Sequence, residues 1–366
     1  MTGPLSGVRI VELSSIGPAP FCAMLLADLG AEVLRIKPPG ARAAAMPIPE
    51  AADPIWRGRS NLTLDLKLPA DVGRLRDILP HADILVEGFR PGVLERLGLG
   101  PEVCLQVNPR LVVGRMTGWG QDGPLAKAPC HDPNILALTG VLHSTGYADR
   151  PPLPPLNIVG DFGGGALYLV MGLLAGLLHA RATGKGQVVD VAMLDAVASL
   201  MGPVYAMRNH GLWSDERGVN ALDGSCPFAR CYETADGRYL MVAALEPQFY
   251  QALLHSLGPL AQSLPDRENK ANWPALHERF AAIFRTRSRD EWTRLLEGAG
   301  ACVSPVLNLA EAQKHPHNQA RKLFAGDPPL PAPAPRFSLT PASIAPHNIG
   351  SVADLLKRWA ARRNPA

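Results

Sequence analysis

The stretch "VRIVELSSIGPAPFCAMLLADLGAEVLRIK", residues 8–37, decides the fold. Its two short aliphatic runs, residues 8–13 and 31–37, predict buried strands, and the longer apolar run at residues 21–30 predicts a helix. A strand, a helix and a second strand in immediate succession are typical of a parallel sheet with helices on its faces.

The same alternation continues through the next eighty residues. Extended runs at residues 61–66, 83–89 and 110–118 alternate with helical patterns at residues 69–82 and 91–98. A further strand, "QVVDVAM", follows a long apolar helix. The sequence therefore predicts an α/β protein whose large domain is Rossmann-like and built on a parallel sheet.

The first strand-to-helix turn, "SSIGPAP" at residues 14–20, has two prolines and one glycine. A nicotinamide or flavin enzyme requires G-x-G-x-x-G at this point, so that the backbone can approach a pyrophosphate. The turn therefore argues against a dehydrogenase.

The chain length of 366 residues favours more than one domain. A β-hairpin at residues 228–246, with "ADG" as its turn, begins a segment of different character, and "SVADLLKRWAARR" predicts a helix that returns to the large domain. We predict a large domain at 1–196 completed by 338–366, a linker at 197–225, a small α+β domain at 226–325 and a proline-rich linker at 326–337.

Composition limits the classes of function. Hydrophobic residues make up 47% of the chain and charged residues 19%. The net charge of +3 comes without a block of lysine and arginine, so no nucleic acid partner is expected.

The most apolar segment, Ala166–Leu178, is too short to cross a bilayer and predicts a buried helix. With no signal peptide pattern and six cysteines without CxxC or zinc spacing, we expect a cytoplasmic protein with no metal and no membrane association.

Three places combine acid–base side chains with a suitable position. In "CHDPNILALTG", residues 130–140, Asp132 fits a helix N-cap and Pro133 the first helical position, which leaves His131 unexplained unless it is a hydrogen-bonded structural histidine. Asp161 in "VGDFGGG" is expected at a strand end, where the glycines would let a substrate approach, although it could be a plain N-cap. Glu246 in "ALEPQFY" ends a hairpin strand and could equally be an exposed carboxylate.

Nine motifs make the chain recognisable, from Gly3 to about Phe337. They are "GPLSGVRIVELSSIGPAPFCAMLLADLGAEVLRIKPP", "GFRPGVLERLGLG", "MTGWGQDGP", "CHD", "VGDFGGG", "TGKGQVVDVAMLDA", "LDGSCPF", "EPQFY" and "ACVSPVL". In this order they resemble the α-methylacyl-CoA racemases, which share the family III CoA-transferase fold.

The resemblance implies a homodimer of interlocked subunits, in which the small domain of one covers the site of the other. It implies catalytic places for His131 and Asp161, with Glu246 arriving from the other subunit to support the histidine. The substrate would be an acyl-CoA thioester, so CoA is not a separate cofactor. Its contacts would be Arg35, Leu66, Lys67 and Arg90, with Arg115 as an addition.

Three positions depart from the racemase pattern. Pro38 replaces an arginine common after "RI", Ile135 replaces a tyrosine near the thioester, and "PAPFCAM" replaces a "PGPHAAM"-like stretch. The phosphate contacts and the acyl pocket are therefore expected to differ from the pattern.

Inversion of the carbon beside a thioester requires one group to remove its proton and another to return one from the opposite side. Burial is expected to raise the pKa of Asp161, and amide groups at the helix start around Asp132 are expected to hold the enolate oxygen. Met193, Met201 and Met207 are either core residues or an adaptable surface for the acyl chain.

Two other functions fit the same scaffold. In a CoA-transferase, Asp161 would attack the thioester and form a mixed anhydride. Transferases usually carry "YD" where this chain has His131-Asp132, which favours the racemase. A non-catalytic acyl-CoA-binding protein is the third possibility, and the presence of all three acid–base residues argues against it.

Overall fold

The computed structural model describes residues 3–40, 48–347 and 350–361. The chain divides into two compact units. The first consists of Met1–Thr139, Pro154–Gly202 and Phe324–Ala366, and the second of Gly140–Leu153 and Pro203–Leu323.

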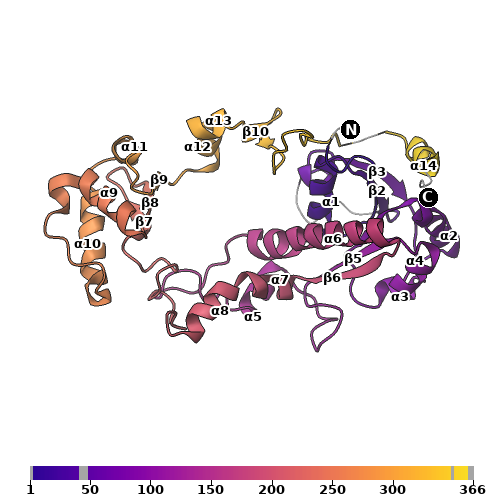
Figure 1. Ribbon diagram of the computed structural model, residues 1–366, viewed down its shortest axis with the longest axis horizontal. Helices are drawn as coiled ribbons and strands as arrows, with labels where there is room; N and C mark the ends of the chain where they lie inside the picture. Colours follow the sequence, from indigo (N-terminus) through magenta and orange to yellow (C-terminus); the bar gives the residue numbers. More distant parts are fainter. Residues whose placement is uncertain (1–2, 41–47, 348–349, 362–366) are drawn as a thin grey trace. The chain divides into compact units, whose positions relative to one another are not determined.

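A six-stranded parallel sheet forms the centre of the first unit (Figure 1). Its order is β3-β2-β1-β4-β5-β6, the order of a Rossmann fold with the reversal between β1 and β4. The parallel α/β expectation is therefore confirmed. The strands are β1 (Arg9–Leu13), β2 (Glu32–Lys37), β3 (Arg59–Thr63), β4 (Ile84–Glu87), β5 (Val112–Thr117) and β6 (Gln187–Ala192).

Helices cover both faces of this sheet because successive strand residues point to opposite sides. Val113 packs on the face covered by α2 (Pro69–Ile78), α3 (Val93–Arg96), α4 (Pro101–Val107) and α14 (Val352–Ala361). Its neighbour Gly114 faces Leu169 and Leu173 of α6 (Leu167–Thr183) on the other side, where α1 (Pro18–Asp28) also lies. Shorter elements of the unit are η1 (Pro54–Trp56), η2 (Leu79–His81), α5 (Asp132–Leu138), η3 (Ile158–Ala166), α7 (Met193–Leu200) and the hairpin of β10 (Phe324–Ala325) and β11 (Leu330–Pro331).

The C-terminal helix returns to the sheet as predicted. Leu355 and Trp359 of α14 are fully buried in the core formed with α2, and the Trp359 indole donates a hydrogen bond to Glu32 of β2 over 2.7 Å. The last residues of the predicted segment, 362–366, lie outside the described residues.

The long apolar helix is only partly buried, which corrects the expectation for Ala166–Leu178. Helix η3 runs into α6, so one continuous helix spans Ile158–Thr183. It packs along β5 and β6 (Figure 1), yet Leu167, Met171 and Leu178 on its other side are 53–69% exposed. At 26 residues it is long and apolar enough to cross a membrane, a test that core helices of soluble proteins also pass.

The second unit is built on an antiparallel sheet of order β7-β8-β9, which confirms the predicted hairpin. Its core comes from the sheet and from the three helices α9, α10 and α11. Pro316 begins a separate short helix after the one that ends at Lys314. The elements are β7 (Ala229–Glu233), β8 (Tyr239–Ala243), β9 (Val303–Pro305), α8 (Gly202–Asn209), α9 (Pro247–Leu257), α10 (Trp273–Phe284), α11 (Arg289–Leu296), α12 (Leu309–Lys314), α13 (Pro316–Ala320) and the short η4 (Gly258–Ala261) and η5 (Lys270–Asn272).

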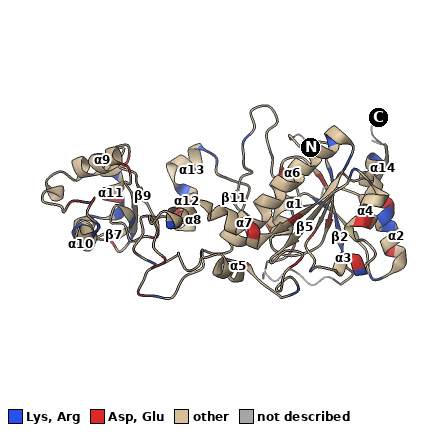
Figure 2. Cartoon of the chain, turned by 60° about the horizontal axis from the view of Figure 1, so that its bottom comes forward, with Lys and Arg blue, Asp and Glu red and all other residues tan. Residues whose placement is uncertain are grey.

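Acidic and basic residues alternate along the helices near α2 and α4 and do not form a face of one sign (Figure 2). This distribution agrees with the low net charge of +3. A charged ligand would therefore be bound by individual side chains and not by a broad surface of one charge.

Candidate active site

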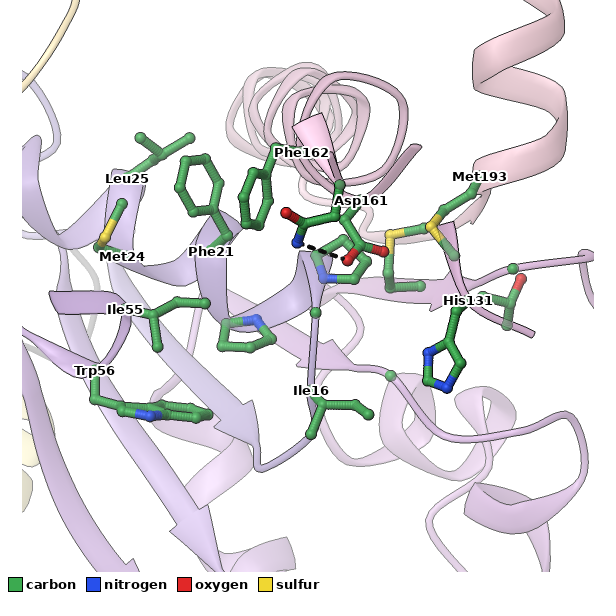
Figure 3. A pocket seen from close by; sticks show the side chains of 18 of the residues that line it. Ile16, Phe21, Met24, Leu25, Ile55, Trp56, His131, Asp161, Phe162 and Met193 are labelled. Atoms are coloured by element: carbon green, nitrogen blue, oxygen red, sulfur yellow. Dashed lines mark hydrogen bonds between the residues drawn. The ribbon is translucent and has the colours of Figure 1, made fainter. Parts of the chain in front are cut away.

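A cavity of about 1060 Å³ lies in the first unit and brings His131 and Asp161 to one site (Figure 3). Residues that follow β1 and β4 line it, together with residues of η1, η3 and the segment before α5. The site therefore lies where ligands bind in open α/β sheets, beyond the carboxyl ends of strands near the reversal of strand order.

His131 is the N-cap of α5, a position that the sequence analysis gave to Asp132. Its backbone N–H donates to the Asn134 side chain over 2.9 Å, and the Asn134 N–H donates to the His131 carbonyl over 2.9 Å. The helix start thus fixes the backbone of His131 and leaves its exposed ring at the cavity wall.

Asp132 is buried behind this wall and does not line the cavity in the described structure. Its Oδ2 accepts hydrogen bonds from the N–H groups of Gly160 at 2.6 Å and Asp161 at 2.8 Å. The carboxylate therefore caps the neighbouring helix η3, 28 residues further along the chain. Of the amides expected to hold an enolate oxygen, Pro133 has none and Asn134 is used by His131, which leaves the N–H of Asp132 itself.

The segment "VGDFGGG" is helical, so the expected strand end before Asp161 is wrong. Three of its glycines, Gly160, Gly164 and Gly165, lie close to other elements. A Cβ on Gly160 would lie 2.5 Å from the Asp132 carboxylate, one on Gly164 2.6 Å from Val197, and one on Gly165 2.7 Å from Pro18. These contacts seat η3 against α5, α7 and α1 and point Asp161 into the cavity.

Burial raises the pKa of Asp161 above its usual range, as the sequence analysis expected. The negative charge of Asp132 raises this pKa further, whereas a hydrogen bond from Asn157 over 3.1 Å and the nearby His131 lower it. Asn157 was not identified from the sequence. Asn157 is the N-cap of η3, four residues before Asp161, a spacing at which two side chains can meet.

Cys130 also lines the cavity beside the histidine. Burial and the neighbouring Asp161 raise the pKa of its thiol, which disfavours the reactive thiolate. Its Sγ occupies the space that a side chain on Gly118 would need, because a Cβ there would lie 2.0 Å from the sulfur.

Of the residues expected to bind CoA, Arg90 is exposed and lines the cavity. Arg35 is buried, its guanidinium stacks 3.6 Å above the Trp56 ring, and it pairs with Glu50 over 2.9 Å. Lys37 donates to the same carboxylate over 2.8 Å. Arg35 and Lys37, at the end of β2, together would suit a phosphate, but in this structure both cations are paired with the Glu50 carboxylate.

The other three CoA candidates lie outside the cavity lining. Arg115 is 7% exposed and bridges Glu87 and Glu95, with 2.8 Å to each carboxylate. Leu66 packs partly against the core, and Lys67 is exposed. Buried Ile135, one of the departures from the racemase pattern, does not line the cavity either, whereas Met193 does.

Glu246 belongs to the second unit, where it is the N-cap of α9. The Arg267 side chain donates to the carbonyls of Ala244 and Leu245 over 3.3 and 3.2 Å and stacks between Phe228 and Tyr250. These contacts of Arg267 fix the short segment between β8 and α9 that carries Glu246.

No group of three or more His, Cys, Asp or Glu side chains suited to a metal ion occurs among the residues the structure describes.

A family model described as CoA-transferase family III matches residues 5–348. The chain belongs to this family.

The relatives include α-methylacyl-CoA racemases. The mouse protein of that name is 43% identical and the human protein 41% identical, each over 92% of this chain and 87% of the relative. A succinyl-CoA–D-citramalate CoA-transferase from Chloroflexus aurantiacus is 30% identical over 93% of this chain and 89% of its own. Among solved structures, a CAIB/BAIF family protein from Brucella suis, 24% identical, covers 98% of this chain and all of its own with a TM-score of 0.82.

Proposed function

We propose that this chain is an α-methylacyl-CoA racemase, which interconverts (2R)- and (2S)-2-methylacyl-CoA thioesters. The observation that carries the proposal is that His131 and Asp161, from different elements, line one cavity. A single α-carbon between them could lose a proton to one group and receive a proton from the other. The similarity to the mouse and human racemases supports this reading.

The electrostatics of Asp161 suit a group that must both donate and accept a proton. An ordinary aspartic acid is ionised at neutral pH and is a poor proton donor, so a raised pKa brings its acid form closer to the working range. Histidine is the side chain that most often serves as a general acid or base. In one direction His131 removes the proton and Asp161 returns one, and in the other direction the roles exchange.

Removal of the α-proton places negative charge on the thioester oxygen. A fixed N–H donor in a water-poor site stabilises such charge in the transition state. We propose the N–H of Asp132 for this part, because the amide lies at the start of α5 directly after His131. Asp132 lies just behind the cavity lining, so the thioester oxygen would have to reach past His131 to meet this amide. The Asp132 carboxylate serves to hold η3 in place.

We further propose that the protein acts as a homodimer of interlocked subunits and that Glu246 of one copy supports His131 of the other. The exposed apolar side of α6, with Leu167, Met171 and Leu178, offers a surface that a second copy could cover. Arg35, Leu66, Lys67, Arg90 and Arg115 are the proposed contacts to CoA. We also propose that the enzyme needs no cofactor apart from its substrate and works in the cytoplasm, a proposal supported by its six free thiols.

Incubation with a 2-methylacyl-CoA in heavy water tests the proposal. A racemase incorporates deuterium at the α-carbon with inversion of configuration. A CoA-transferase would instead move CoA to a free carboxylic acid without deuterium incorporation. Inversion of configuration that survives in either His131→Ala or Asp161→Asn would refute the proposed roles.

A further inference from the structure

The carboxylate of Glu50 lies between two cations at the end of β2. Its Oε1 accepts hydrogen bonds from Arg35 Nη1 at 2.9 Å and from Lys37 Nζ at 2.8 Å, and its Oε2 accepts from Lys37 at 2.8 Å. Arg35 and Lys37 are two residues apart on one strand, so their side chains share a face of the sheet. One carboxylate therefore bridges both cations.

Arg35 is a fixed hydrogen-bond donor. Its side chain is 5% exposed, its guanidinium stacks 3.6 Å above the Trp56 ring, and its Nη2 donates to the Ser14 hydroxyl over 3.0 Å. The guanidinium is thus held by β2, by the end of β1 and by η1. A buried cation without an anion is costly, so this position requires a negative group whether or not a ligand is bound.

Glu50 is the exposed partner of this cluster. Its side chain is 35% exposed and belongs to a turn that precedes η1. Burial would raise the pKa of Glu50, but the hydrogen bond from Lys37 and the positive charge of Arg35 lower it, so the group is ionised at neutral pH. Rotation of the Glu50 side chain alone would release both cations, without any opening of the core.

The cluster borders the cavity that holds His131 and Asp161. The Trp56 ring, on which Arg35 stacks, is part of the cavity wall (Figure 3). A ligand whose reacting end lies at His131 and Asp161 would reach the cations by extending along η1. The group that suits them is a phosphate, because its oxygens can accept from a guanidinium and an ammonium group together.

We propose that Glu50 is an internal competitor for a phosphate group of the substrate. It occupies Arg35 and Lys37 in the free protein and leaves them when a phosphate of CoA binds. This inference rests on the proposed function, which supplies a ligand that carries phosphates. A phosphate has more oxygens and more negative charge than a carboxylate, so it can replace Glu50 at both cations. Glu50 therefore neutralises the buried Arg35 between turnovers and limits the affinity for CoA.

The test measures binding by calorimetry to the wild-type protein and to Glu50→Gln, which keeps the size of the side chain and removes its charge. The probes are CoA, dephospho-CoA, which lacks the 3′-phosphate, and pantetheine, which has no phosphate. Glu102→Gln is the matched control, because it removes the same charge from an exposed position on α4.

We expect Glu50→Gln to bind CoA about tenfold more tightly than the wild type, which is the gain if the cations are free about one tenth of the time without ligand. The affinity for pantetheine should not change, and the control should match the wild type. If dephospho-CoA gains as much as CoA, the diphosphate replaces Glu50, whereas a gain for CoA alone assigns the 3′-phosphate. Either result supports the proposal.

Two further variants make the result specific to this cluster. Lys37→Gln should weaken CoA binding, and in that background Glu50→Gln should gain less, because one of the two cations is gone. Glu50→Asp keeps the charge on a shorter side chain and should show a smaller gain of the same kind. It also provides the measurement if Glu50→Gln does not fold. Unchanged or weaker CoA binding in the folded Glu50 variants, or an equal gain for pantetheine, would overturn the proposal.

The binding experiment does not depend on proton exchange, so it separates this proposal from the proposed function. A protein that gains CoA affinity in Glu50→Gln but incorporates no deuterium would refute the racemase and keep the role of Glu50. Normal deuterium incorporation with unchanged CoA affinity in Glu50→Gln would refute the role of Glu50 alone. In an active enzyme, Glu50→Gln should lower KM for the acyl-CoA about tenfold and leave kcat unchanged, because the effect is on binding at a distance from the reacting groups.

Discussion

Replacement of Asp132 by asparagine tests how the site is built, because this buried carboxylate serves both η3 and Asp161. It accepts two backbone N–H groups, at 2.6 and 2.8 Å, and its charge raises the pKa of Asp161. Asparagine keeps a carbonyl oxygen in nearly the same place but removes the charge. The two contributions can therefore be measured separately.

The stability effect follows from the hydrogen bonds. A bond to a charged acceptor contributes about 1.5–3 kcal/mol and a neutral one about 1 kcal/mol. Asp132→Asn should therefore lower the free energy of unfolding by about 1–4 kcal/mol in total. Asp132→Ala leaves two buried N–H groups without an acceptor and should cost about 3 kcal/mol or more. Urea denaturation of both variants measures these differences.

The catalytic effect has a definite sign. Without the negative charge of Asp132 the pKa of Asp161 falls, so the limb of the pH–rate profile that reports Asp161 moves to lower pH in Asp132→Asn. The assay is deuterium incorporation into a 2-methylacyl-CoA between pH 4 and pH 9. Asp77→Asn, which removes an exposed charge on α2, is the control and should leave the limb in place.

An unchanged limb in a well-folded Asp132→Asn protein would refute the reasoning, because Asp132 would then not influence Asp161. A shift to higher pH would refute it as well. Loss of stability in Asp132→Asn equal to that in Asp132→Ala would show that the charge, and not the acceptor oxygen, holds η3.

Three further predictions concern single residues. Asp161→Asn should abolish inversion of configuration, while His131 can still exchange the α-proton for deuterium on its own side. The same variant should raise stability to urea at pH 7, and this gain should shrink as the pH falls toward 3.8, because a raised carboxyl pKa costs stability only where the group must ionise. Trp359→Ala should cost about 3–5 kcal/mol in urea denaturation, whereas Trp359→Phe loses mainly the bond to Glu32 and should cost about 1–2 kcal/mol. Gly118→Ala should lower kcat/KM at least about tenfold by displacing Cys130, and the added substitution Cys130→Ala should restore most of it in the same assay.

The sheet could be predicted from the sequence because its signals are local. The inner strands are short runs rich in aliphatic residues. In one of them, Arg9–Leu13, every residue is buried. The hairpin of β7 and β8 could be predicted as well, because "ADG" marks its turn. Helix α9 was missed because its only start signal is Pro247 after Glu246, a residue that the sequence analysis assigned to chemistry.

The glycine-rich segment could not be predicted because its conformation depends on distant residues. A Gly-Asp pair followed closely by three glycines favours a turn when only local preferences are considered. In the structure the segment is a helix whose first amides bind Asp132 and whose glycines fit against Val197 and Pro18. These partners are remote in the chain, so no window of sequence around Asp161 contains the information.

The pairing of His131 with Asp132 has a single structural reason, which also explains how two remote groups meet at one cavity. His131 caps α5, and the next residue extends its carboxylate behind the cavity wall to the amide of Asp161. The buried side chain of Asp132 thus links the backbone of His131 to the backbone of Asp161. A displacement of η3 would move Asp161 away from His131 and expose two N–H groups that Asp132 now satisfies. The interaction that stabilises the helix therefore also sets the separation of the two groups that would exchange the proton.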